Sequence, residues 1–136
     1  MFSISLINWL AVVVAAIVAF VVGMIWYSPQ LFGKEMMESM PKSRGGKKPS
    51  VAMPMLGAFI ATLITAFVLE ALISAYGTTS YTGALKWAGA IWLGFYFAYG
   101  LVGLAYGQIS MKNFVVNRAH DLIALAVIAV VLVAMV

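Results

Sequence analysis

The feature that most constrains this chain is a set of four apolar stretches, each long enough to cross a lipid bilayer. Their approximate bounds are 7–26, 51–76, 84–106 and 114–136. A spanning helix needs about 20 apolar residues, and a backbone in lipid must satisfy its own hydrogen bonds, so each stretch is expected to be helical. The sequence therefore predicts an all-α fold, a single integral membrane domain over 1–136 built as a bundle of four transmembrane helices.

The composition supports this class and excludes others. Of 136 residues, 65% are hydrophobic and 9% are charged, whereas soluble domains average about 45–50% apolar and about 25% charged. A soluble enzyme or a nucleic-acid-binding domain is therefore not expected, and we expect a multi-pass protein of the cell membrane with the lipid bilayer as its first partner. The chain has one His and no Cys. These are too few ligands for a metal site in one subunit, and no cofactor is expected.

Basic residues determine the predicted orientation. Lys112 lies on the same side of the membrane as the connection 28–50. That connection contains Lys34, Lys42, Arg44, Lys47 and Lys48. Because positively charged loops stay in the cytoplasm, we expect the loop 28–50 inside, against anionic lipid headgroups, and both termini outside. Within the loop, residues 32–40 are compatible with a short interfacial helix.

Polar residues in the fourth span form the first candidate site. They are Asn117, Arg118, His120 and Asp121, and helical spacing allows Arg118 to pair with Asp121 three residues later. One interpretation is a neutral pair that fixes helix packing. The other is a polar site that faces a cavity or pore, with His120 able to change charge near neutral pH.

Glu70 is a second polar residue within a span, and its helix face continues to Ser74 one turn later. From their depth on the third span, Trp92 and Lys86 are the expected donors to Glu70. The residue is interpreted either as a structural, hydrogen-bonded carboxylic acid or as a site that binds a proton or cation. Helical depth places it too far from Asp121 for the two to touch, so we expect two separate sites.

Aromatic residues and glycines recur along the third span. Trp92, Tyr96 and Tyr99 follow one helix face, at depths that could connect the two polar sites. Because buried tyrosine hydroxyls need partners, this face is interpreted as a packing surface or as part of a path. Gly103 and Gly107 have the GxxxG spacing, which favours close approach of a second helix and makes this face a candidate seam between copies.

The end of the first span carries a specific motif, Gly-Met-Ile-Trp-Tyr-Ser-Pro-Gln-Leu-Phe-Gly-Lys at 23–34. Together with Asn-Trp-Leu-Ala at 8–11, Trp-Leu-Gly-Phe at 92–95 and Asn117 followed by His120, it resembles the domain of unknown function 1761 family of small four-helix membrane proteins. The resemblance implies the four-helix membrane fold and brings no established activity. The signature residues are Trp26, Tyr27, Ser28, Pro29, Phe32, Gly33 and Lys34.

Two functions from different classes fit these residues. The first is a small oligomeric transporter or channel for a proton, a cation or a small solute, with a route along Glu70, Tyr96, Tyr99, His120 and Asp121. The alternative is a non-catalytic accessory or scaffold subunit of a membrane complex, whose polar residues hold helices together. An enzyme is not expected because no catalytic constellation is recognisable. In either case we expect a homo-oligomer or a larger membrane assembly.

Overall fold

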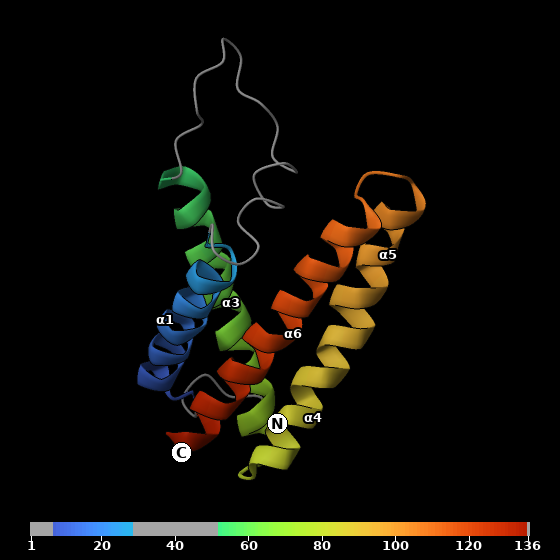
Figure 1. Cartoon of the computed structure of the whole chain (residues 1–136). Coiled ribbons are helices and arrows are strands. Elements are labelled where there is room, and N and C mark those ends of the chain that lie inside the picture. Colours follow the sequence, from blue (N-terminus) through green and yellow to red (C-terminus); the bar gives the residue numbers. More distant parts are fainter. Residues whose placement is uncertain (1–6, 29–51, 136) are drawn as a thin grey trace.

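Figure 1 shows the computed structural model of the chain, which describes residues 7–28 and 52–135. In these residues every regular element is a helix, and the expected all-α class is confirmed. The described chain contains four helical spans long and apolar enough to cross a membrane. The elements are α1 (Trp9–Trp26), α3 (Ala52–Ala75), α4 (Tyr81–Ile91), the π-helix η2 (Trp92–Phe97), α5 (Ala98–Ala105) and α6 (Met111–Ala134).

The connection between α1 and α3 lies outside the described residues, apart from Tyr27 and Ser28. The expected interfacial helix over 32–40 falls there, and the position of this loop in the cytoplasm stays a prediction. The same segment contains four of the signature residues, which are Pro29, Phe32, Gly33 and Lys34.

Polar caps determine where three of the helices begin. Asn8, Ser80 and Ser110 precede α1, α4 and α6, and each side-chain oxygen accepts a backbone N–H three residues later, at 3.1, 3.0 and 3.2 Å. Such caps satisfy N–H groups that have no partner in the first helical turn. They explain why the third and fourth spans start at Tyr81 and Met111, three residues before the expected positions.

Glycines end two of the helices. Gly77 and Gly107 have φ angles of 63° and 71°, in the left-handed region that glycine adopts without strain. After α5, the N–H of Gln108 returns to the carbonyl of Gly103 at 2.9 Å, a common way to close a helix end. Gly107 thus terminates the helix, and Gly103 and Gly107 do not form a GxxxG face.

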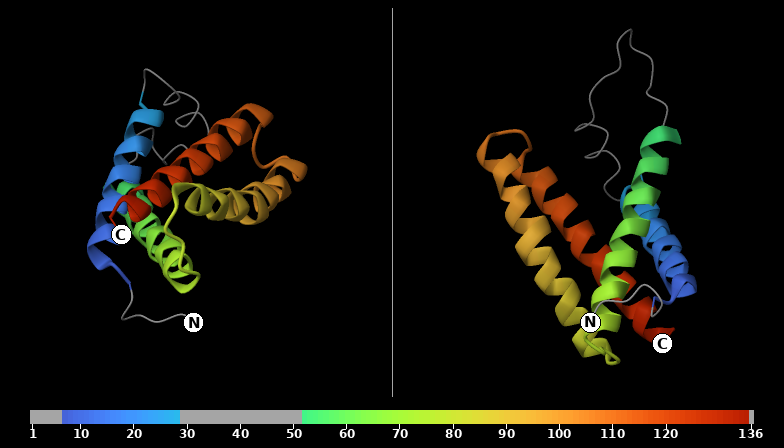
Figure 2. Two further views of the ribbon diagram at one scale, coloured as in Figure 1. Left: turned by 90° about the horizontal axis from the view of Figure 1, so that it is seen from below. Right: turned by 180° about the vertical axis from the view of Figure 1, so that it is seen from behind.

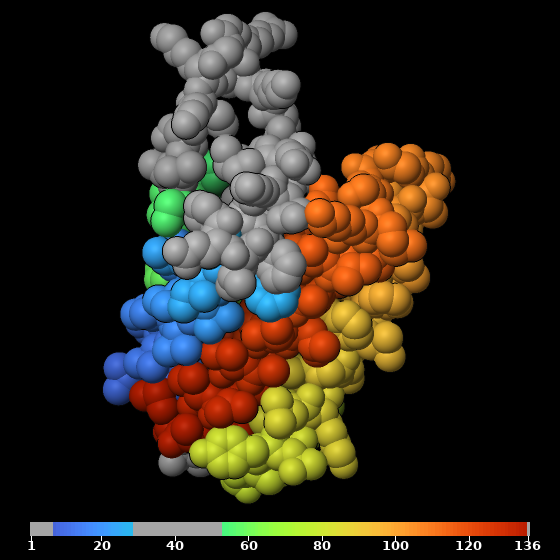
Figure 3. Space-filling model, viewed as in Figure 1, coloured from blue at the N-terminus to red at the C-terminus, as the bar shows by residue number. Residues whose placement is uncertain are grey.

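α6 is the central helix of the bundle. α1 and α4 both pack along it, and α1 also packs along α3. α1 and α3 lie on one side of α6 and the continuous rod from α4 to α5 lies on the other (Figures 1 and 2). On the face shown in Figure 3, α6 crosses the surface between α1 and α4.

Two names distinguish the ends of the bundle. The terminal end holds the start of α1, the α3–α4 turn and the end of α6, and the loop end holds the end of α1 and the α5–α6 turn. The largest fully buried side chains belong to α3 and α6 and lie toward the terminal end. They are Leu69, Ile73, Leu125, Ile128 and Leu132.

Every fourth residue on one face of α1 is a buried alanine. Ala11, Ala15 and Ala19 are at most 3% exposed. Small side chains let helix backbones approach closely in lipid, and this face allows α1 to pack against α3 and α6 together.

The alanine face predicts that a larger side chain destabilises the protein on the buried face of α1 but not on its exposed face. Ala15→Leu should lower the free energy of unfolding by about 1–3 kcal/mol, because extra methyl groups in a close-packed interface force helices apart. Val13→Leu is the matched control on the same helix, at a residue that is 43% exposed. Reversible unfolding in detergent micelles measures both, and equal stability of the two variants would contradict close packing along this face.

Candidate functional sites at the two ends of the bundle

The first candidate site lies in the half of α6 nearer the loop end. Arg118 Nη2 and Asp121 Oδ2 are 2.9 Å apart, so the structure contains the ion pair that the three-residue spacing predicts. On the other carboxylate oxygen, His120 Nδ1 lies 3.4 Å from Asp121 Oδ1. The three side chains are between 18% and 25% exposed. Asp121 therefore lies between a guanidinium and an imidazole in a partly shielded environment.

The π-helix of the third span holds this arginine from the opposite side. Trp92 Nε1 donates to the backbone carbonyl of Arg118 at 2.7 Å, and Arg118 Nη1 donates to the carbonyl of Tyr96 at 3.3 Å. Single π-turns within α-helices are frequent at functional sites. Trp92 therefore donates to α6. The prediction that it donates to Glu70 is wrong.

The C-terminal end of α1 packs onto the same part of α6. Tyr27 Oη donates to Asn117 Oδ1 at 2.7 Å, and Trp26 Nε1 donates to the carbonyl of Val116 at 3.3 Å. The rings of Tyr27 and His120 lie 5.0 Å apart. Two signature residues therefore connect the first span to the fourth. We call the set Tyr27, Asn117, Arg118, His120 and Asp121 the loop-end cluster.

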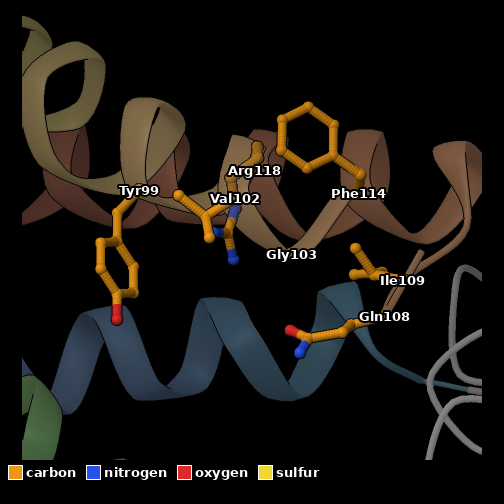
Figure 4. Close-up of a pocket in the computed structure, with 8 residues that line it drawn as sticks. Tyr99, Val102, Gly103, Gln108, Ile109, Phe114 and Arg118 are labelled. Carbon is orange, nitrogen blue, oxygen red and sulfur yellow. The ribbon is translucent and has the colours of Figure 1, made fainter. Parts of the chain in front are cut away.

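An open groove of about 310 Å³ lies between α5 and α6 beside this cluster. The side chains of Tyr99, Gln108 and Arg118 project from its walls (Figure 4). Tyr99 is 80% exposed, whereas the hydroxyl of Tyr96 lies 3.4 Å from Thr65 Oγ1 on α3. The tyrosine face expected on the third span is therefore divided between the groove and the bundle interior.

The second candidate site lies at the terminal end, around Glu70. This side chain is 4% exposed, and its Oε1 accepts the Ser74 hydroxyl at 2.8 Å and the backbone N–H of Asn8 at 3.5 Å. Asn8 Nδ2 donates in turn to the carbonyl of Met135 at 3.1 Å. Glu70 thus sits at the N-terminus of α1, where the helix dipole favours negative charge. We call Asn8, Glu70, Ser74 and Met135 the terminal-end site.

Sequence reasoning does not find the Asn8 contact. It points to Trp92 and Lys86 as donors to Glu70, whereas Lys86 lines a separate surface hollow. Asn8 is identifiable as a helix cap, because an asparagine directly precedes an apolar run. Its contacts lie 62 and 127 residues away along the chain, and no local pattern indicates them.

The two sites are well separated, as expected. Asp121 and Met135 lie fourteen positions apart on and just beyond α6, which corresponds to about 21 Å along a helix. Between 7 and 28 and between 52 and 135, no three His, Asp or Glu side chains come together as a metal site would require.

The helices and their two polar sites define a small multi-span membrane protein with its polar residues held between helices. The model of one protein family matches residues 10–133, and its description is "Protein of unknown function (DUF1761)". The chain belongs to this family, which confirms the resemblance of its motifs. No curated protein and no solved structure matches the chain.

The environment of Tyr27 predicts a change of stability in alkaline solution. Burial raises the pKa of Tyr27 from 10.0 to about 12, with the charge of Asp121 acting in the same direction and that of Arg118 against it. The folded state therefore keeps a proton that the unfolded state releases, and stability falls as the pH rises from 10.0 toward 12.

Tyr27→Phe isolates this contribution. Below pH 10 the wild type should be more stable by about 0.5–1.5 kcal/mol, because the variant loses the hydrogen bond to Asn117. This difference should shrink between pH 10 and pH 12, since ionisation then costs stability only in the wild type. Thermal unfolding of both proteins across this range gives the difference, and a constant value would contradict the assignment.

Proposed function

We propose that the protein is a non-catalytic accessory or scaffold subunit of a membrane assembly. The observation that supports this function is that Glu70, Asn117 and Arg118 each make a hydrogen bond to another helix of the same chain. Glu70 links α3 to α1, while Arg118 pairs with Asp121 within α6 and reaches η2. Contacts of this kind hold the helices in place, and this role does not depend on a route for a solute through the bundle.

The third span offers a surface for such an assembly. Of the 18 consecutive residues that make this span apolar enough to cross a membrane, 6% are buried within the chain. The corresponding share is 28% in each of the other three spans. Leu93 and Phe95 on η2 are 58% and 70% exposed. Aromatic residues are enriched at protein interfaces, which supports a second copy or another membrane subunit as the partner that covers this face.

The location that accompanies this proposal is the cell membrane, with the loop end inside and both termini outside. Lys112 lies at the loop end, and the strongly basic connection between α1 and α3 begins and ends there. Lys86 lies in α4, toward the terminal end. This imbalance supports the orientation because cytoplasmic loops carry the excess of basic residues.

Transport of a proton, cation or small solute is the second candidate, and one observation favours it. The groove between α5 and α6 reaches Arg118, whose partner Asp121 also lies beside the imidazole of His120. A route from there to Glu70 would pass the level of Ala66, which is 0% exposed. Transport therefore requires the packed part of the bundle to open.

The paired role of Arg118 and Asp121 predicts a specific pattern of stability. Asp121→Asn should lower the free energy of unfolding by about 1–3 kcal/mol, because it leaves the partly buried guanidinium of Arg118 without its anionic partner. Combining it with Arg118→Gln should recover much of this loss, since neither charge is then left without its partner. Unfolding in detergent micelles measures both variants. A double variant no more stable than Asp121→Asn alone would refute the structural role.

Site-specific photo-crosslinking in native membranes tests the assembly itself. A photoreactive residue at Phe95 should give one protein–protein product of fixed mass, because this side chain is expected in an interface. The control carries the same residue at Leu10, which is 67% exposed on α1, and should give no such product. Crosslinks to lipid alone at Phe95 would contradict the assembly.

A flux assay separates the two candidate functions. The purified protein in liposomes should move protons and monovalent cations no faster than protein-free liposomes do. Flux that Asp121→Asn abolishes, while the folded double variant Arg118→Gln with Asp121→Asn also stays inactive, would favour transport over the accessory function.

A further inference from the structure

The groove between α5 and α6 has one polar part and one apolar part. Gln108 lies in the turn at the loop end and Arg118 lies on the wall, whereas Val102, Ile109 and Phe114 supply apolar surface. Figure 4 shows the Gln108 and Arg118 side chains projecting into the same space between the helices. The groove continues along α5 to Tyr99, and the eight residues from Tyr99 to Gly107 correspond to about 12 Å of helix.

Arg118 has donors left for a further acceptor. A guanidinium carries five N–H donors in a planar fork. Its Nη2 faces Asp121 and its Nη1 faces the carbonyl of Tyr96. Among the described residues Nε has no hydrogen-bond partner, although it is buried. Each Nη carries two N–H groups and makes one contact within the chain, so an incoming anion would meet the second N–H of Nη1 and of Nη2.

A glycine opposite Arg118 makes room for the guanidinium beside α5. A Cβ at Gly100 would lie 2.6 Å from Arg118 Nη1 and 3.1 Å from the Phe114 ring. Any side chain at this position would push the guanidinium and the ring away from α5. Gly100 therefore lets the charged group lie flat against the helix that forms the other wall.

The position and charge of the groove favour a membrane lipid as its occupant. Arg118 lies seven residues, or about 10 Å, from the start of α6 at the loop end, a distance from which a long arginine side chain can extend toward the headgroups. Lys112 and Arg118 outnumber Asp121 on this part of α6. A groove wall formed by Val102, which is 49% exposed, opens sideways toward the bilayer, and a soluble anion would gain nothing from it.

We propose that this groove binds one anionic phospholipid, with its phosphate on Arg118 and an acyl chain along Val102 and Phe114. Arginine suits phosphate because its planar donors match two phosphate oxygens. Basic pockets between transmembrane helices are known to hold acidic lipid headgroups. The lipid would cover the apolar wall and supply acceptors for the N–H groups that Nη1 and Nη2 do not use within the chain.

Retention of lipid through detergent purification, measured by native mass spectrometry, tests this site. The wild type is incubated with phosphatidylglycerol or with phosphatidylcholine and then washed with detergent. It should retain one phosphatidylglycerol per chain and much less phosphatidylcholine. Val102→Trp fills the groove and leaves every charge in place. It should reduce retention by about tenfold, which corresponds to about 1.4 kcal/mol of binding free energy.

The matched control is Leu101→Trp, which adds the same side chain to the neighbouring position of α5, 41% exposed and outside the groove lining. It should bind lipid as the wild type does. Arg118→Gln should lose the preference for phosphatidylglycerol, and Lys86→Gln, far from the loop end, should keep it. If Arg118→Gln fails to fold, the comparison of the two tryptophan variants decides.

Three results would overturn the proposal. They are equal retention of the two lipids by the wild type, equal loss of lipid in Val102→Trp and Leu101→Trp, and a thermal stabilisation by inorganic phosphate as large as that by phosphatidylglycerol. The last result would identify a site for a small anion and not for a lipid.

Discussion

A guanidinium group inside an apolar bundle must find acceptors within reach, and the arrangement of the loop end depends on this requirement. Arg118 finds one acceptor on its own helix, in Asp121, and another on η2, at the carbonyl of Tyr96. Trp92 returns a hydrogen bond to the backbone of the same arginine. The third and fourth spans are thus joined by polar contacts around one cation, at the turn where the third span departs from α-helical geometry.

The two ends of the bundle are held together by different forces. At the terminal end, large aliphatic side chains of α3 and α6 pack with the alanines of α1, and burial is nearly complete. Toward the loop end, α5 diverges from α1 and α3 (Figure 2), and several of its side chains are exposed. Hydrogen bonds from Trp26, Tyr27 and Trp92 to α6 stabilise this end in place of a dense core.

Local sequence patterns predicted the parts of this structure that depend on local physics. Long apolar runs predicted the four spans, and a spacing of three residues predicted the pair of Arg118 and Asp121. The π-turn is not predictable in this way, because its sequence is typical of an ordinary apolar α-helix. Its backbone departs from α-helical geometry where it contacts a different span. Depth alone also pointed to Trp92 and Lys86 as the partners of Glu70 and did not suggest Asn8, since depth cannot tell which way a side chain points around its helix.

The contact between Asn8 and Met135 has a consequence for how the protein is made. A ribosome delivers the chain from its N-terminus, so α1 can enter the membrane before Met135 has been synthesised. Asn8 can bind the carbonyl of Met135 only after the last helix has been inserted. Until then the alanine face of α1 can pack against α3 but not yet against α6. α1 therefore leaves the ribosome before α6 but reaches its final packing only after α6 is in place, and a chain that stops before α6 leaves one side of α1 uncovered.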